Sequence, residues 1–192
     1  MKSLEDLLAR WRAAQAEFEA DLEAALQERR EAFHYRIEQG RVRFADGIRA
    51  LQRQHRIDLW RYLFGARISH ILSAPIIYSL IVPLVLLDVM ASLYQHTCFR
   101  IYGIERVLRR DYIIIDRHLL GYLNLIEKIN CVYCGYGNGV IAYVREIAAR
   151  TERYWCPIKH ARRSRDPHEL EASFIDYGDA EGWKHRSRPP AE

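Results

Sequence analysis

Twenty consecutive residues of this chain, from Ile68 to Leu87, carry no formal charge. At about 1.5 Å per residue, a helix over this run is about 30 Å long, which is close to the thickness of the hydrocarbon core of a bilayer. A charge-free run of this length is uncommon in a small soluble protein, so it restricts the folds open to the chain. The sequence therefore predicts a transmembrane or re-entrant segment over residues 68–94.

Basic residues flank the apolar run on both sides. Seven arginines lie between residues 41 and 67, and four more lie between residues 100 and 110. Basic flanks around an apolar segment are typical of a membrane surface. The formal net charge is only +4, so we expect no binding to nucleic acid. Membrane lipids are the predicted partners, and the bacterial inner membrane is the predicted location.

Two layouts of the apolar segment stay open. Pro75 and Pro83 each remove a backbone donor and kink a helix, and Asp88 costs about 2.5–3.5 kcal/mol if it lies at mid-bilayer. Either one kinked helix crosses the bilayer, or the segment bends near Pro83 and returns over residues 84–102. The length favours the crossing, whereas the arginines at both ends favour the return. We expect the same-side layout, with the soluble parts in the cytoplasm.

Residues 1–60 predict an amphipathic, coiled-coil-like helical region, which Gly40 and Gly47 break into two helices. Gln15 and Arg29 interrupt its apolar seam. Two interpretations stay open, namely packing on the same chain and formation of a homo-oligomer through the seam. The apolar residues recur mostly at steps of three and four: Leu4, Leu8, Trp11, Phe18, Leu22, Ala25, and then Phe33, Ile37, Phe44, Ile48 and Leu51.

The four cysteines of the chain all follow the apolar segment. The first thirty residues are charged and do not look like a secretory signal, which favours a reducing compartment. There, Cys131-Val-Tyr-Cys134 predicts metal binding or redox activity, and the glycine after Cys134 permits the turn that makes two thiolates converge. The rest of the chain predicts a helical cysteine domain over residues 98–180 and a disordered tail over residues 181–192.

The predicted metal ligands are Cys131, Cys134, Cys156 and Cys98, with His160 as the alternative fourth ligand. Pro157 predicts the start of a helix, which puts Cys156 at its N-cap and His160 one turn later. Separate helices are expected over residues 119–130 and 140–148, the second opened by Gly137-Asn-Gly139. Three or four thiolates suit zinc or iron, so these are the cofactors expected here.

Two long motifs resemble those of a group of uncharacterised bacterial membrane proteins. They are Tyr122-Leu-Asn-Leu-Ile-Glu-Lys-Ile-Asn-Cys131-Val-Tyr-Cys134-Gly-Tyr-Gly-Asn-Gly139 and Arg150-Thr-Glu-Arg-Tyr-Trp-Cys156-Pro-Ile-Lys-His160. The resemblance extends over roughly residues 70–180 and includes Asp176-Tyr-Gly-Asp-Ala180. It implies a membrane protein in which the cysteines act together. No activity is established for the group, so the resemblance assigns no catalytic residue.

The fold expected from these observations is mainly α, with amphipathic N-terminal helices, one membrane segment and a small helical cysteine domain. No catalytic constellation is found, so the chain gives no positive indication of an enzyme. The first hypothesis is a membrane-anchored, metal-binding protein with a structural or interaction role. The alternative is membrane-associated electron transfer or redox sensing through thiolate-bound iron or the Cys131/Cys134 dithiol.

Overall fold

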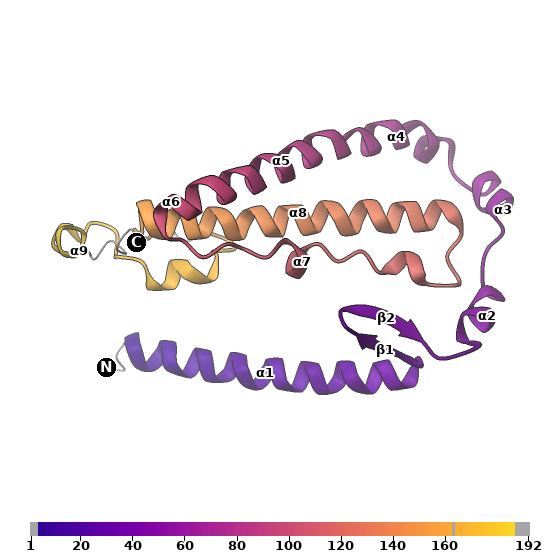
Figure 1. Cartoon of the computed structure of the whole chain (residues 1–192), viewed down its shortest axis with the longest axis horizontal. Helices are drawn as coiled ribbons and strands as arrows, with labels where there is room; N and C mark the ends of the chain where they lie inside the picture. The colour runs from indigo at the N-terminus through magenta and orange to yellow at the C-terminus, as the bar shows by residue number, and fades with distance from the viewer. Residues whose placement is uncertain (1–3, 163, 187–192) are drawn as a thin grey trace. The chain divides into compact units, whose positions relative to one another are not determined.

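The structure is a computed structural model that describes residues 4–162 and 164–186. It is mainly helical, as predicted, and it contains one long apolar helix (Figure 1). The chain divides into two compact units: Met1–Ile57 with Leu119–Asn124, and Asp58–His118 with Leu125–Glu192.

The first unit contains one long helix, a hairpin and a short helix. Their bounds are α1 Leu4–Ala32, β1 Tyr35–Glu38, β2 Arg41–Phe44 and α2 Ile48–Arg53. The structure does not confirm the amphipathic interpretation of α1, because none of its described side chains is buried. The segment Leu119–Asn124 joins this unit through the backbone N–H of Gly121, which donates to Gln52 Oε1 at 2.9 Å.

The prediction that residues 33–51 continue as helix is wrong for residues 35–44, which form a hairpin, whereas residues 48–51 are helical in α2. The two strands of the hairpin are antiparallel, and Tyr35 pairs with Phe44. The connecting residues Gln39 and Gly40 have φ values of 50° and 72°. Two consecutive positive φ angles are what a two-residue type I′ turn requires, and such a turn matches the twist of the strands that it joins. Glycine at the second position makes that turn inexpensive.

A continuous helical rod of 35 residues, Ile68–Tyr102, forms one side of the second unit. The short helix α3 precedes it. The rod itself consists of the α-helices α4, α5 and α6, with the π-helical turn η1 between α5 and α6. The bounds are α3 Leu59–Phe64, α4 Ile68–Ser79, α5 Ile81–Tyr94, η1 Gln95–Phe99 and α6 Arg100–Tyr102. We call Ile68–Tyr102 the apolar rod. It does not turn back at Pro83, so the return that was predicted over residues 84–102 is not formed.

Pro83 fits the rod because it lies in the first turn of α5, where its missing N–H has no helical partner to lose. The chain turns instead at Gly103, whose φ is 65°. From there it runs back beside the rod as a mostly extended segment, residues 103–118, which we call the return segment. This segment contains the short helix α7 Arg109–Tyr112, and the 3₁₀ turn η2 Arg117–Leu119 follows at its end.

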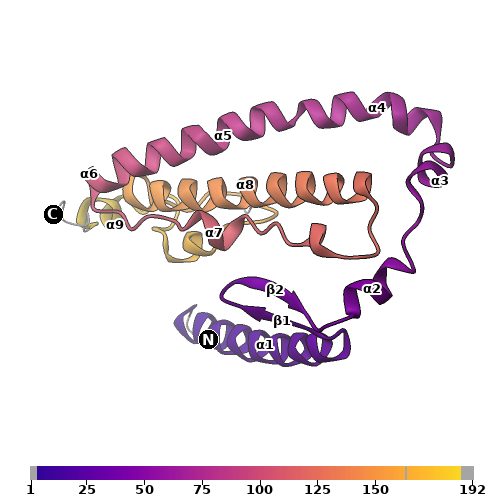
Figure 2. The ribbon, with the colours of Figure 1, turned by 45° about the vertical axis from the view of Figure 1, so that its right-hand side comes forward.

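Helix α8, Leu125–Trp155, then runs parallel to the rod over 31 residues. Tyr78 donates a hydrogen bond to Asn130 near the start of α8, and Tyr94 bonds Thr151 near its end at 3.1 Å. Figures 1 and 2 both show the rod along one side of this unit, with α8 and the return segment beneath it. The buried core of the unit lies between these three elements and comprises Ala91, Phe99, Val107, Tyr143 and Ile147.

The prediction that α8 is two helices separated at Gly137 is wrong. Its glycines lie inside one helix and allow other backbone to approach it. A Cβ atom added at Gly139 would lie 2.8 Å from both Ile113 Cα and Tyr112 O. A Cβ at Gly135 would lie 3.0 Å from Ile114 O. These glycines therefore give the return segment room to pack on α8, and they do not begin a helix.

The residues after α8 do not form the helix that was predicted to start at Pro157. Residues 156–160 are irregular instead: Ile158 N–H donates to Cys156 O at 2.7 Å, and Ile158 forms an isolated parallel bridge with Ile175. The 3₁₀ turn η3, Glu169–Ser173, and the short helix α9, Ala180–His185, follow. The predicted tail over residues 181–192 is thus helical at its start, and residues 187–192 lie outside the described part of the chain.

Candidate functional site

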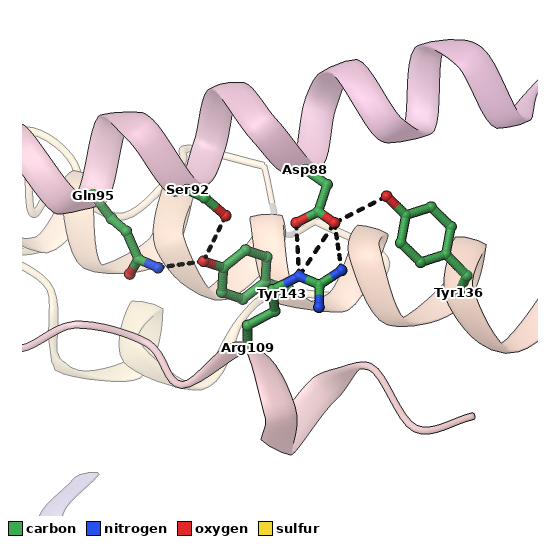
Figure 3. A network of polar contacts seen from close by, with 6 residues as sticks. All are labelled: Asp88, Ser92, Gln95, Arg109, Tyr136 and Tyr143. Carbon is green, nitrogen blue, oxygen red and sulfur yellow. Dashed lines mark hydrogen bonds and ion pairs between the residues drawn. The ribbon is translucent and has the colours of Figure 1, made fainter. Parts of the chain in front are cut away.

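Polar side chains gather on the face of the rod that points toward α8 and the return segment (Figure 3). Asp88 and Gln95 are 6% and 2% exposed, although the helix that carries them is otherwise apolar. Asp88, Ser92 and Gln95 follow one another at steps of four and three residues, which keeps them on one helical face. We call these three residues, with Arg109, Tyr136 and Tyr143, the inner polar network.

The carboxylate of Asp88 is paired with Arg109 from the return segment. Arg109 Nε lies 3.0 Å from Oδ1 and Nη2 lies 2.7 Å from Oδ2, so the contact is bidentate. The hydroxyl of Tyr136, on α8, donates to Oδ2 at 2.9 Å. A bidentate guanidinium and a phenol together satisfy a carboxylate that water hardly reaches. The Asp88 carboxylate thereby joins the rod to the return segment through Arg109 and to α8 through Tyr136.

The protonation states of the two partners of Asp88 fit their roles as donors. The hydrogen bond to Asp88 raises the pKa of the Arg109 guanidinium above its ordinary value. Burial, followed by the hydrogen bond to Asp88, raises the pKa of the Tyr136 phenol. Both groups therefore keep their protons at neutral pH.

A second part of the network holds the start of the return segment. The side-chain amide of Gln95 donates from Nε2 to Val107 O at 3.3 Å and accepts at Oε1 from Val107 N at 3.0 Å. Nε2 also donates to the Tyr143 hydroxyl, which in turn lies 3.2 Å from Ser92 Oγ. Every polar atom of the Gln95 side chain is thus engaged in a region with no access to water.

This network is an arrangement that binds elements together, and nothing in it resembles a catalytic constellation. Both oxygens of its carboxylate already accept hydrogen bonds from a guanidinium and a phenol, so neither is free to act as a base. Asp88 was expected to be a costly charge in a membrane, and its partner Arg109 was not identified from the sequence. The two residues are 21 positions apart, and only the turn at Gly103 brings them together.

An apolar groove of about 340 Å³ lies between α5 and α8, on the side of the rod near Cys134. Its lining comprises Leu80, Pro83, Leu84, Leu87, Tyr133, Cys134, Gly137, Asn138 and Ile141. The groove carries no charged side chain, so it continues the apolar surface of the rod toward α8.

The structure places the cysteines of the predicted metal site at different levels of the second unit. Cys131 and Cys134 lie one turn apart inside α8, the first half-buried and the second exposed. Cys156 follows Cys134 by 22 positions, almost all of them helical. At about 1.5 Å per residue, about 33 Å of helix separates the two. Two thiolates on one zinc ion lie within about 4 Å of each other.

The other two predicted ligands do not complete a site either. Cys98 is half-buried in η1, next to Phe99, whose ring packs on Tyr94 at 5.7 Å. His160 is exposed on the irregular chain after Cys156. Among the residues that the structure describes, no three His, Cys, Asp or Glu side chains are grouped to hold a metal ion. The residues therefore do not fit a shared zinc or iron centre within one chain, because the unbroken α8 keeps Cys134 and Cys156 apart. Metal binding stays a prediction.

The opposite face of the rod is apolar and uncovered. Only 6% of its most apolar window is buried, so it is not the enclosed core helix of this unit. The outward side chains recur at helical spacing and are more than half exposed: Leu72, Ile76, Val82, Leu86, Val89 and Leu93. We call these six residues the outer stripe.

The chain matches no family model, no curated protein and no solved structure.

Proposed function

We propose that this chain is a membrane-anchored protein with a structural or interaction role, and that the apolar rod is its anchor. The observation that carries the proposal is the outer stripe, a row of large aliphatic side chains left uncovered by the second unit. Contiguous apolar surface of this kind is rare on a soluble monomer and marks a protein or membrane contact. The rod is also long and apolar enough to span a bilayer.

The inner polar network supports the structural part of the proposal. It attaches the return segment and α8 to the rod. The segments that pack on α8 are therefore held at the membrane together with the rod. Exposed charges on the return segment, such as Arg110 and Asp111, are then presented beside the membrane. The bacterial inner membrane and its cytoplasmic face are part of this proposal.

Fractionation of cells that express the full chain tests the anchor. We expect the protein in the membrane pellet after washes with high salt and with alkaline carbonate, because apolar burial does not depend on charge. Recovery of the wild-type chain in the soluble fraction would contradict the proposal.

A matched pair of variants makes this test specific. The test variant changes four residues of the outer stripe to Gln: Leu72, Val82, Leu86 and Leu93. The control variant changes four exposed apolar residues of α1 to Gln: Leu7, Trp11, Phe18 and Leu22. We expect the first variant to shift to the soluble fraction and the second to stay in the pellet. Equal behaviour of the two would show that the stripe is not the anchor.

A second candidate function is redox sensing through Cys131 and Cys134. The observation that favours it is their spacing of three residues on one helix, with Cys134 exposed. Closure of a disulfide would release two protons and pass two electrons to a disulfide or quinone oxidant. Thiol titration and peptide mass analysis of the purified protein, before and after mild oxidation, test this candidate. Metal analysis of the same sample tests the prediction of zinc or iron.

A further inference from the structure

We infer that the apolar rod lies in the plane of the membrane, with its outer stripe in the lipid and the rest of the second unit above it on the cytoplasmic side. This inference rests on the proposed membrane anchor and adds its orientation. The interaction surface is the outer stripe, and the partner is a lipid bilayer with anionic headgroups.

The first argument is the position of charge beside the rod. Near Tyr78, the Arg117 guanidinium donates to Cys131 O at 3.4 Å, and Tyr133 on the same turn of α8 donates to Ile77 O. Near Asp88, the side chains of Arg110 and Asp111 are 82% and 58% exposed.

Charge also lies near the far end of the rod. Near Tyr94 and Thr151, Arg150 pairs with Glu105, whose side chain is 93% exposed. A crossing needs about 20 residues of the rod in the hydrocarbon core. Any such stretch within Ile68–Tyr102 includes the level of Tyr78 or that of Asp88, so each crossing brings charged side chains of the folded unit into lipid.

The second argument is the backbone of the return segment. Residues 104–108 and 113–116 are neither helix nor paired strand. Irregular backbone exposed to lipid leaves N–H and C=O groups without partners, and such segments do not occur in the hydrocarbon region. Each exposed charge at the bilayer centre adds a further cost of insertion. A crossing of the intact unit is therefore strongly unfavourable.

The third argument is the layered arrangement of the unit. Figures 1 and 2 show the rod on one side of the unit and α7 on the other, and Figure 3 shows Arg109 reaching the rod from that other side. A helix with its side chains is about 10 Å across, and helices that lie in the interface sink about 5–10 Å into it. The rod alone thus fills the depth available, and the charges on the rest of the second unit stay in water.

The fourth argument is the charge at the ends of the rod. Arg67 precedes it and Arg100 lies in its last turn, and between them only Asp88 carries a formal charge. Asp88 is neutralised inward by Arg109. The lipid-facing surface is therefore uncharged, with one arginine near each end for anionic headgroups.

Depth measurement by fluorescence quenching tests the orientation. A fluorophore is attached at Leu72→Cys, Val82→Cys or Leu93→Cys, in the full chain with its natural cysteines changed to serine. Vesicles of phosphatidylethanolamine and phosphatidylglycerol carry nitroxides at known depths. In the plane, we expect all three labels at the same shallow depth. In a crossing helix, Val82 would lie about 15 Å deeper than one end, because ten residues separate them.

The outcomes separate the two proposals. Equal depths support the in-plane rod. A deep Val82 label, or a depth that changes steadily from Leu72 to Leu93, overturns the inference and leaves the membrane anchor intact. No quenching at any position, together with no sedimentation on vesicles, overturns both.

A second measurement uses the unaltered chain, in case the cysteine-free variant does not fold. Reporters that are active on only one side of the inner membrane are fused to each terminus. We expect both termini on the cytoplasmic side. Termini on opposite sides would overturn the in-plane orientation whatever the depth measurement gives.

Discussion

The two faces of the apolar rod are made by one sequence but have opposite chemistry. The outer stripe consists of aliphatic side chains that are more than half exposed, whereas the inner face carries Asp88, Ser92 and Gln95 in a hydrogen-bond network (Figure 3). On the proposed function, one helix serves as both anchor and scaffold. Changes on the inner face should therefore alter the stability of the second unit, and changes on the outer face should alter its membrane binding.

Breaking the ion pair should have the largest effect on stability. Arg109→Ala leaves the buried Asp88 carboxylate without its charged partner, and we expect a loss of about 2–3 kcal/mol in the free energy of unfolding. Asp88→Asn leaves a guanidinium that is 49% exposed and can be hydrated, so we expect a loss of only about 1 kcal/mol. Denaturant unfolding in detergent micelles measures both. A larger loss for Asp88→Asn would contradict the asymmetry.

Removing the amide of Gln95 should have the next largest effect. Gln95→Leu keeps the volume but leaves the N–H and C=O of the buried Val107 without partners, and we expect a loss of about 2 kcal/mol. Thr97→Leu, at an exposed position two residues later, is the control and should change stability by less than about 0.5 kcal/mol. Equal losses in the same unfolding assay would show that the amide does not hold the return segment.

Alanine at each of two glycines of α8 should change stability by less than the changes above, and in different directions. Gly139→Ala puts a methyl group against the backbone of Ile113, and we expect a net loss of about 1–2 kcal/mol. Gly137→Ala meets only the end of the Leu84 side chain, at 3.2 Å, so the higher helix propensity of alanine should leave stability unchanged or raised by about 0.5 kcal/mol. Thermal unfolding compares the pair, and a loss for both would contradict the packing described.

The outer face should give the smallest effect on stability. Val89→Gln in the outer stripe should change the free energy of unfolding by less than about 0.5 kcal/mol in detergent. It should nevertheless weaken sedimentation on lipid vesicles, because one aliphatic side chain is worth about 1.5–3 kcal/mol of burial. Unchanged vesicle binding with reduced stability would mean that this face packs on protein.

The helical class and the apolar rod were predictable because a long charge-free run has few other solutions. The hairpin was missed because Phe33, Ile37, Phe44 and Ile48 also fit helical spacing. The signal that could have found it was Gln39-Gly40 between two alternating apolar segments.

The candidate site was harder to predict. The pairing of Asp88 with Arg109 depends on the path of the return segment, which no local pattern specifies. Cys-x-x-Cys has the same spacing in a metal-binding turn and on a helix, so spacing alone did not distinguish them. The glycines after Cys134 looked like a break because the approach of Tyr112 and Ile113 to α8 is a tertiary contact.

The side chain of Gln95 has one further consequence. Its amide presents to Val107 the same donor and acceptor that a neighbouring peptide group would present in a sheet. The route of the loop between them is thus specified by main-chain atoms, whatever side chains it carries. The side chains of the exposed Glu105 and Arg106 can therefore vary. Adding or deleting a residue there, in contrast, would move Val107 away from the Gln95 amide that pairs with its backbone.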